Sequence, residues 1–160
     1  MAVKMLARGT VSISNASLGF KNFSGAEGQY NRKGDRNFVV FLETEDAQLL
    51  DQNGWNIKWP KPNPDIADDM DSRNPYLPIS LSFNEKYPNL NPKVVLIAGE
   101  RKNVLMEEEL DMLDWAEIEN ADLVIRPYNW AVNGNTGIKA YLDAGYITIV
   151  VDEFSDKYGI

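Results

Sequence analysis

Cations and aromatic rings alternate along a segment near the C-terminal end of the sequence, and their spacing is that of a β-hairpin. If residues 122–131 form a strand, successive side chains point to opposite faces. Leu123 and Ile125 then lie on one face. The other face carries a mixed set of side chains, which are Val124, Arg126, Tyr128 and Trp130.

The second strand of this hairpin repeats the pattern. Ile138, Ala140 and Leu142 share one face, and Lys139 and Tyr141 share the other. One face of the hairpin is therefore aliphatic and suited to a core, whereas the opposite face mixes cations with rings. Rings that stack on bases and cations that meet phosphates are how proteins hold single-stranded nucleic acid. The predicted binding surface of the hairpin comprises Arg126, Tyr128, Trp130, Lys139 and Tyr141.

An alternative for this face is a solvated strand surface, or a surface covered by a neighbouring helix. Burying Arg126 and Lys139 under a helix would be costly unless each cation were paired. This cost favours an open, ligand-binding face.

A second candidate is the loop over residues 21–36, which contains three glycines and is basic. Its aromatic residues are interleaved with cations, a pattern typical of a flexible clamp on a strand, although an ordinary solvated loop is the alternative. The predicted contacts in this loop are Lys21, Phe23, Tyr30, Arg32, Lys33 and Arg36. A third, smaller candidate is a turn over residues 99–103, where Arg101 and Lys102 would contact phosphate.

Composition excludes most catalytic chemistry. The chain has neither Cys nor His, which removes thiol nucleophiles, disulfides, serine-triad hydrolysis and most zinc sites. We therefore predict no enzyme activity, no cofactor and no metal. Four aspartates form the exception to consider, but their spacing lacks the Gly turn and terminal Glu of a calcium loop, so a solvated acidic loop is expected. They are Asp65, Asp68, Asp69 and Asp71.

The net charge of −8 argues against nonspecific duplex binding driven by bulk charge, yet it permits a locally basic groove. At 160 residues and 44% hydrophobic content, we expect a single folded domain over residues 1–160, with an acidic, Pro-rich excursion at about 60–78. The sequence has no apolar run long enough for a membrane span and no full signal-peptide core. A cytoplasmic location is therefore expected.

Hydrophobic periodicity predicts about eight short strands and two helices. After the strand at 10–14, the apolar set changes phase, so either a bulge near Ser14–Asn15 or a turn precedes the set Ala16, Leu18 and Phe20. The other predicted strands are 38–42, 55–59 with both tryptophans in the core, 79–83, 93–98, 122–131, 138–142 and 146–151. The predicted helices are 45–53 and 107–118, the second with Leu110, Leu113 and Trp115 inward.

Because the strands are not separated by regular crossover helices, a mainly β fold is predicted, an OB-like Greek-key β-barrel with two short helices. A β-sandwich is the structural alternative.

Three stretches carry a resemblance to a known family. They are the first strand with its glycine-rich basic loop, residues 35–42 (Asp-Arg-Asn-Phe-Val-Val-Phe-Leu), and residues 126–142, where Arg-Pro-Tyr-Asn-Trp leads to Gly-Ile-Lys-Ala-Tyr-Leu. In layout the chain resembles the small single-stranded-DNA-binding proteins of bacteriophages. The resemblance implies an OB fold that coats exposed single-stranded DNA during replication or recombination, with replication or recombination proteins as further partners.

Three other functions compete with this reading. A phage structural or assembly protein would use the same hairpin to contact another subunit. An inhibitor would use its acidic surface to occupy a nucleic-acid-binding partner. The third, an enzyme with a carboxylate-held metal, has the least support.

Overall fold

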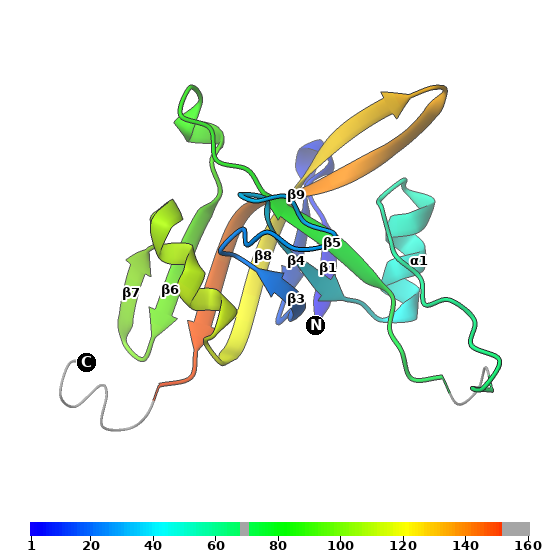
Figure 1. Cartoon of the computed structure of the whole chain (residues 1–160), viewed down its shortest axis with the longest axis horizontal. Helices are drawn as coiled ribbons and strands as arrows, with labels where there is room; N and C mark the ends of the chain where they lie inside the picture. Colours follow the sequence, from blue (N-terminus) through cyan, green and yellow to red (C-terminus); the bar gives the residue numbers. More distant parts are fainter. Residues whose placement is uncertain (68–70, 152–160) are drawn as a thin grey trace.

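The computed structural model describes residues 1–67 and 71–151, and in this part nine strands form one sheet (Figure 1). The strands are β1 (Ala2–Met5), β2 (Val11–Ser14), β3 (Ser17–Asn22), β4 (Arg36–Phe41), β5 (Tyr76–Leu81), β6 (Lys93–Ala98), β7 (Arg101–Val104), β8 (Ile118–Val132) and β9 (Asn135–Ile149). The helical elements are the α-helix α1 (Thr44–Gln52) and the 3₁₀ segments η1 (Ala7–Gly9), η3 (Pro88–Leu90) and η4 (Glu107–Asp114).

The strand order is β1-β2-β8-β9-β5-β4-β3, and β6 also pairs with β9. Two strands thus share one edge of β9. β5 runs parallel to it at residues 140–141, and β6 runs parallel to it at 144–149. The predicted mainly β class is confirmed, and the pairing joins the strands into one sheet rather than the two of a sandwich. The sheet is not a closed barrel, because no pairing between β1 and β3, at the two ends of the path, closes it within the described residues.

The core lies on one face of this sheet and is entirely nonpolar among the described residues. Alternate residues of several strands supply it, for example Leu77 and Ile79 of β5. Leu110 and Leu113 of η4 complete it from the opposite side, and both are fully buried. Burying each of these leucines stabilises the fold by about 1.5–3 kcal/mol. The outer face of the sheet is left for polar and aromatic side chains.

The predicted hairpin is confirmed but is longer than expected, since β8 and β9 each have 15 residues. β9 combines the two strands predicted at 138–142 and 146–151. The strand is continuous between these two segments because β5 and then β6 pair with the same edge of β9. On its other edge, a register shift between Val124 and Ile125 lets β8 stay paired along the whole strand. Asn133 and Gly134 close the hairpin with φ of 51° and 81°, the positive values that a two-residue type I′ turn requires. The outer part of the hairpin projects from the sheet (Figure 1).

The segment that joins β2 to β3 is a turn, so the turn alternative is correct and the bulge is wrong. Asn15 has a φ of 49°, and β2 pairs with β8 whereas β3 pairs with β4. The Asn15 N–H donates to Asp122 Oδ1 at 2.9 Å, which fixes the turn against β8.

The helix predicted at 107–118 is a 3₁₀ segment that ends at Asp114, and residues from Ile118 onward belong to β8. Leu110 and Leu113 point inward as predicted, but the inward placement of Trp115 is wrong, because this residue is 89% exposed. The helix predicted at 45–53 is confirmed as α1.

The strand predicted at 55–59 is wrong as a regular strand. It makes two isolated bridges, from Trp55 to Ile138 and from Lys58 to Tyr76. Trp55 is buried as predicted, whereas Trp59 is 40% exposed and its indole N–H donates to Asp51 Oδ2 at 2.9 Å.

Two further boundaries differ from those predicted. The strand predicted at 79–83 is β5, which begins earlier, at Tyr76, so the excursion predicted to run to residue 78 ends at 75.

In the excursion, a side-chain hydrogen bond from Arg73 lowers the pKa of the Asp71 carboxyl to about 2. Asp68 and Asp69 lie outside the described residues. No helix of the described part is both long and apolar enough to span a membrane.

Candidate nucleic-acid interface

Tyr141 of β9 is the centre of a cluster on the outer face of the β8–β9 hairpin. The guanidinium carbon of Arg126 lies 4.9 Å from the centroid of its ring, and Lys139 Nζ lies 5.0 Å from it. Tyr128 meets the same ring edge-on, with centroids 6.0 Å apart and an interplanar angle of 88°. The strand register brings them together, since Arg126 is opposite Tyr141 and Tyr128 is opposite Lys139. We call these four residues the Tyr141 platform.

Arg126 has an unusual feature within this platform. Its Nε atom is buried and has no hydrogen-bond partner among the described residues. Buried polar atoms without partners are rare in folded proteins and often mark functional positions. That Arg126 belongs to a binding site stays a prediction.

Trp130 lies farther out on the same hairpin, where its ring packs on the backbone of Gly137. A Cβ atom at Gly137 would be 2.6 Å from Trp130 Cζ2, so any larger residue would displace the ring. The indole is 37% exposed and lines a shallow pocket of about 400 Å³ beside Gly54, at the end of α1. Trp130 is therefore next to the platform along β8 but makes a separate surface.

A groove of about 600 Å³ joins the platform to the basic loop between β3 and β4. Its floor is the outer face of β4 and β5, with short uncharged side chains such as Ser80 and Val39. The predicted site residues that line it are Tyr30, Arg32, Arg36, Lys139 and Tyr141. Two regions predicted separately from the sequence thus border one groove.

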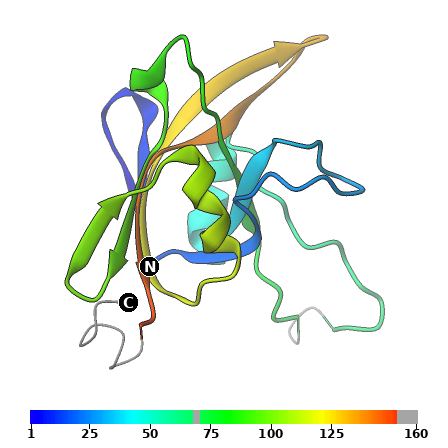
Figure 2. The same cartoon turned by 60° about the vertical axis from the view of Figure 1, so that its left-hand side comes forward.

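The loop extends away from the sheet (Figure 2). Tyr30 is 94% exposed, and Arg32 is exposed and paired with Asp35 at 3.3 Å. Lys33 is also exposed, although it does not line the groove. Rings and cations are both available here, as the clamp hypothesis requires.

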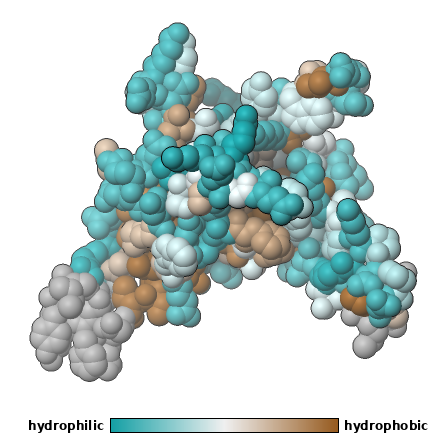
Figure 3. Space-filling view, in the orientation of Figure 1, coloured by the Kyte–Doolittle hydropathy of each residue, from teal (hydrophilic) through white to brown (hydrophobic). Residues whose placement is uncertain are grey.

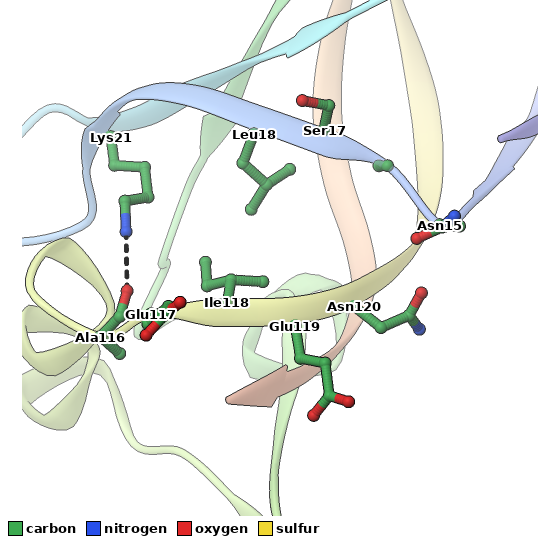
Figure 4. A pocket seen from close by; sticks show the side chains of 10 residues that line it. Asn15, Ser17, Leu18, Lys21, Ala116, Glu117, Ile118, Glu119 and Asn120 are labelled. Carbon is green, nitrogen blue, oxygen red and sulfur yellow. Dashed lines mark hydrogen bonds between the residues drawn. The ribbon is translucent and has the colours of Figure 1, made fainter. Parts of the chain in front are cut away.

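Three predicted contact residues have structural roles at the base of this loop instead. Phe23 is fully buried and stacks on Phe38 with centroids 5.0 Å apart, so the prediction that it stacks on a base is wrong. Lys21 Nζ donates to the carbonyls of Leu113, at 2.8 Å, and Ala116, at 3.1 Å. Figure 4 shows the second of these bonds, beside a pocket between β3 and the start of β8.

Arg36 is the third of these residues. It donates to the carbonyl of Phe23, and it pairs with Glu107 at 3.2 Å and Asp111 at 3.5 Å. Its side chain is largely buried. The cationic residues at the base of the loop therefore fasten it to η4, a role that a count of charges along the sequence does not reveal.

We expect Arg36→Met to lower the free energy of unfolding by about 1–3 kcal/mol, because the Phe23 carbonyl would lose its partner. The surface ion pairs add little to this value. Arg32→Met is the matched control and should leave stability unchanged, since Arg32 is exposed. Urea denaturation of both variants measures the difference, and equal stabilities would contradict the anchoring role of Arg36.

Arg101 and Lys102 are not brought to the groove. They lie in β7, a strand where a turn was predicted, and β7 pairs only with β6 in the described part. β6 follows the 144–149 half of β9, on the opposite side of the molecule from the projecting hairpin (Figure 1).

Comparison with known proteins places the chain in a family. A family model described as a putative phage ssDNA-binding domain matches residues 2–160. No curated protein matches the sequence. Among solved structures, the single-stranded DNA-binding protein from bacteriophage Enc34 is 16% identical, with a TM-score of 0.55 over 98% of this chain and 93% of that chain.

The same Enc34 protein solved in complex with ssDNA is 15% identical, with a TM-score of 0.54 over 95% of this chain and 93% of that chain. At these identities the likeness establishes a shared fold. The family match covers nearly the whole sequence and confirms the resemblance seen in it. The chain therefore belongs to the family of putative phage single-stranded-DNA-binding domains.

Proposed function

We propose that the protein binds single-stranded DNA along the groove and the Tyr141 platform, as one domain and without catalysis, in phage DNA replication or recombination. The observation that carries this proposal is the continuity of the two surfaces. Tyr141 and Lys139 of the hairpin and Tyr30 and Arg32 of the loop line one groove, with an uncharged floor between them.

The chemistry of the groove divides into stacking and charge. Bases stack on Tyr141, Tyr128 and Tyr30, and each stacked base contributes about 1–3 kcal/mol. Phosphates meet Lys139, Arg32 and Lys33, with release of counterions. Because every base has a π-face, sequence preference is weak.

The acidic net charge is compatible with this mode of binding. Arg32 and Lys139 line the groove, and the negative net charge of the chain disfavours contact with duplex away from it. The Enc34 protein, which has the same fold, was solved in complex with ssDNA, and this supports the proposal over a structural or inhibitor role. The proposal also implies that the protein acts in the cytoplasm of the host cell.

A titration with fluorescent oligonucleotides tests the proposal. Single-stranded DNA should bind more tightly than duplex of equal length at low and at moderate salt, and tryptophan fluorescence should change because Trp130 lies beside the site. Equal affinity for the two forms, or no binding to either at low salt, would remove the proposal.

A further inference from the structure

Three aromatic rings form a second cluster on the outer face of the sheet, outside the groove. Phe20, Phe41 and Tyr76 come from β3, β4 and β5, and each ring meets the other two edge-on. Their centroids are 5.7–6.0 Å apart. Phe20 is 69% exposed, so the cluster opens to solvent. We call these residues the aromatic trio.

The backbone of β3 is distorted in a way that brings Phe20 to this face. Phe20 has a φ of 43°, which is uncommon for an aromatic residue, and the register of β3 shifts between Gly19 and Asn22. With regular alternation Phe20 would point to the face opposite Gly19, as Leu18 does. Residues with strained backbone conformations cluster at functional sites. The distortion explains why Phe20 left the apolar set predicted for the core.

Gly19 makes room for the trio. A Cβ atom on Gly19 would lie 2.2 Å from the Phe41 ring, so this ring packs directly on the backbone of β3. Trp130 packs on Gly137 in the same manner. In both places a glycine seats an aromatic ring on the outer face of the sheet.

The trio continues the floor of the groove. In the strand register, Ser80 of β5 is paired with Tyr141 of β9 on one side and with Asn37 of β4 on the other. These three residues form a first row across the sheet. The next row along β5 pairs Pro78 with Val39 and is also part of the groove. The row after that pairs Tyr76 with Phe41. Residues two apart on a strand share a face and are about 7 Å apart, so the trio begins one step beyond the groove.

A cation accompanies the trio. Lys58 and Tyr76 exchange both backbone hydrogen bonds, at 2.8 and 3.0 Å, so their side chains lie on the same face. Exposed rings beside an exposed ammonium group are the combination found on the Tyr141 platform. Figure 3 shows hydrophobic surface near the middle of this face, over the region of β3 and β4, with hydrophilic surface around it.

We infer that the aromatic trio is a second base-stacking site, which the same single strand of DNA reaches after it leaves the groove. The inference rests on the proposed function and extends it. Bases are the occupant that fits, because the trio adjoins the proposed nucleic-acid groove and is flanked by a cation. A strand running from Tyr141 across Ser80 and Pro78 would meet Phe20 and Tyr76 next, with Lys58 near its backbone.

Oligonucleotide length separates the two sites. An oligomer of about 4 nucleotides should fill the groove alone, whereas one of about 16 nucleotides should also reach the trio; these lengths span the site sizes of single OB folds. Phe20→Ala should weaken binding of the long oligomer by about 5- to 150-fold and leave binding of the short one unchanged. Tyr87→Ala removes an exposed ring in the 82–92 connection and is the matched control, with no loss expected for either oligomer.

Crosslinking provides a second measurement on the unmodified protein. A long oligomer that carries 5-iodo-deoxyuridine at one end should crosslink to the peptide that contains Phe20 or Tyr76. Absence of this crosslink, an unchanged affinity of Phe20→Ala for the long oligomer, or equal losses for both lengths would each overturn the inference.

Two further outcomes distinguish the sources of failure. If the unmodified protein binds neither oligomer, the proposed function fails together with the second site. If Phe20→Ala changes the sedimentation coefficient of the free protein while its DNA affinity is retained, the trio is a contact between copies of the chain and the inference is wrong.

Discussion

Tyr141→Ala is expected to weaken binding of single-stranded DNA by about 5- to 150-fold, the range for loss of one stacked base. The ring is the shared neighbour of Arg126, Lys139 and Tyr128, so its removal also leaves these side chains without the surface that orients them. Fluorescence titration with a labelled oligonucleotide measures the change.

Tyr141→Phe is the control for this prediction, because it keeps the ring and removes the hydroxyl. It should bind almost as tightly as the unmodified protein. Urea denaturation should show that both variants remain folded. Unchanged affinity in a folded Tyr141→Ala protein would mean that the platform is a solvated surface, the alternative considered for it from the sequence.

Replacing together three exposed cations, two that line the groove and Lys33 of the adjacent loop, should flatten the salt dependence of binding. For the triple variant of Arg32, Lys33 and Lys139 to Gln, the slope of log affinity against log salt should fall by about 2, since each phosphate contact with a single strand contributes about 0.7. Affinity at low salt should fall sharply as well, whereas at high salt the variant and the unmodified protein should converge.

The double variant of Arg101 and Lys102 to Gln is the control for this measurement. Both residues lie in β7, away from the groove, so the slope should be unchanged. A reduced slope would show that the β6–β7 hairpin is part of the DNA path and that the groove describes only part of the site. An unchanged slope in the triple variant would contradict the assignment of all three cations.

The hairpin was predictable because alternation is local. The pairing of Arg126 with Tyr141 follows once two strands and a short turn are recognised, and no other part of the chain needs to be known. The continuity of the groove was not predictable in this way. It depends on β5 lying parallel to β9, a pairing between strands far apart in the sequence.

Burial explains the errors among the loop residues. Phe23 and Arg36 fit the composition of a clamp, but both have partners outside the loop. Phe23 stacks on Phe38, and Arg36 pairs with Glu107. A run of cations and rings does not show which of them face inward. The face predicted for Phe20 was wrong for a different reason. A local change in backbone conformation turns its side chain to the face opposite the one that alternation assigns to it.

The length of the β8–β9 hairpin has a consequence for how the family can diverge. Its inner half carries Leu123 and Ile125 into the core, whereas its outer residues from Tyr128 to Val132 are exposed. Insertions, deletions and substitutions at the tip, where residues 131–136 are all exposed, therefore leave the packing of the inner half intact. Natural variation can lengthen or shorten this arm, and so change how much of a ligand it reaches, under selection that is separate from selection for folding.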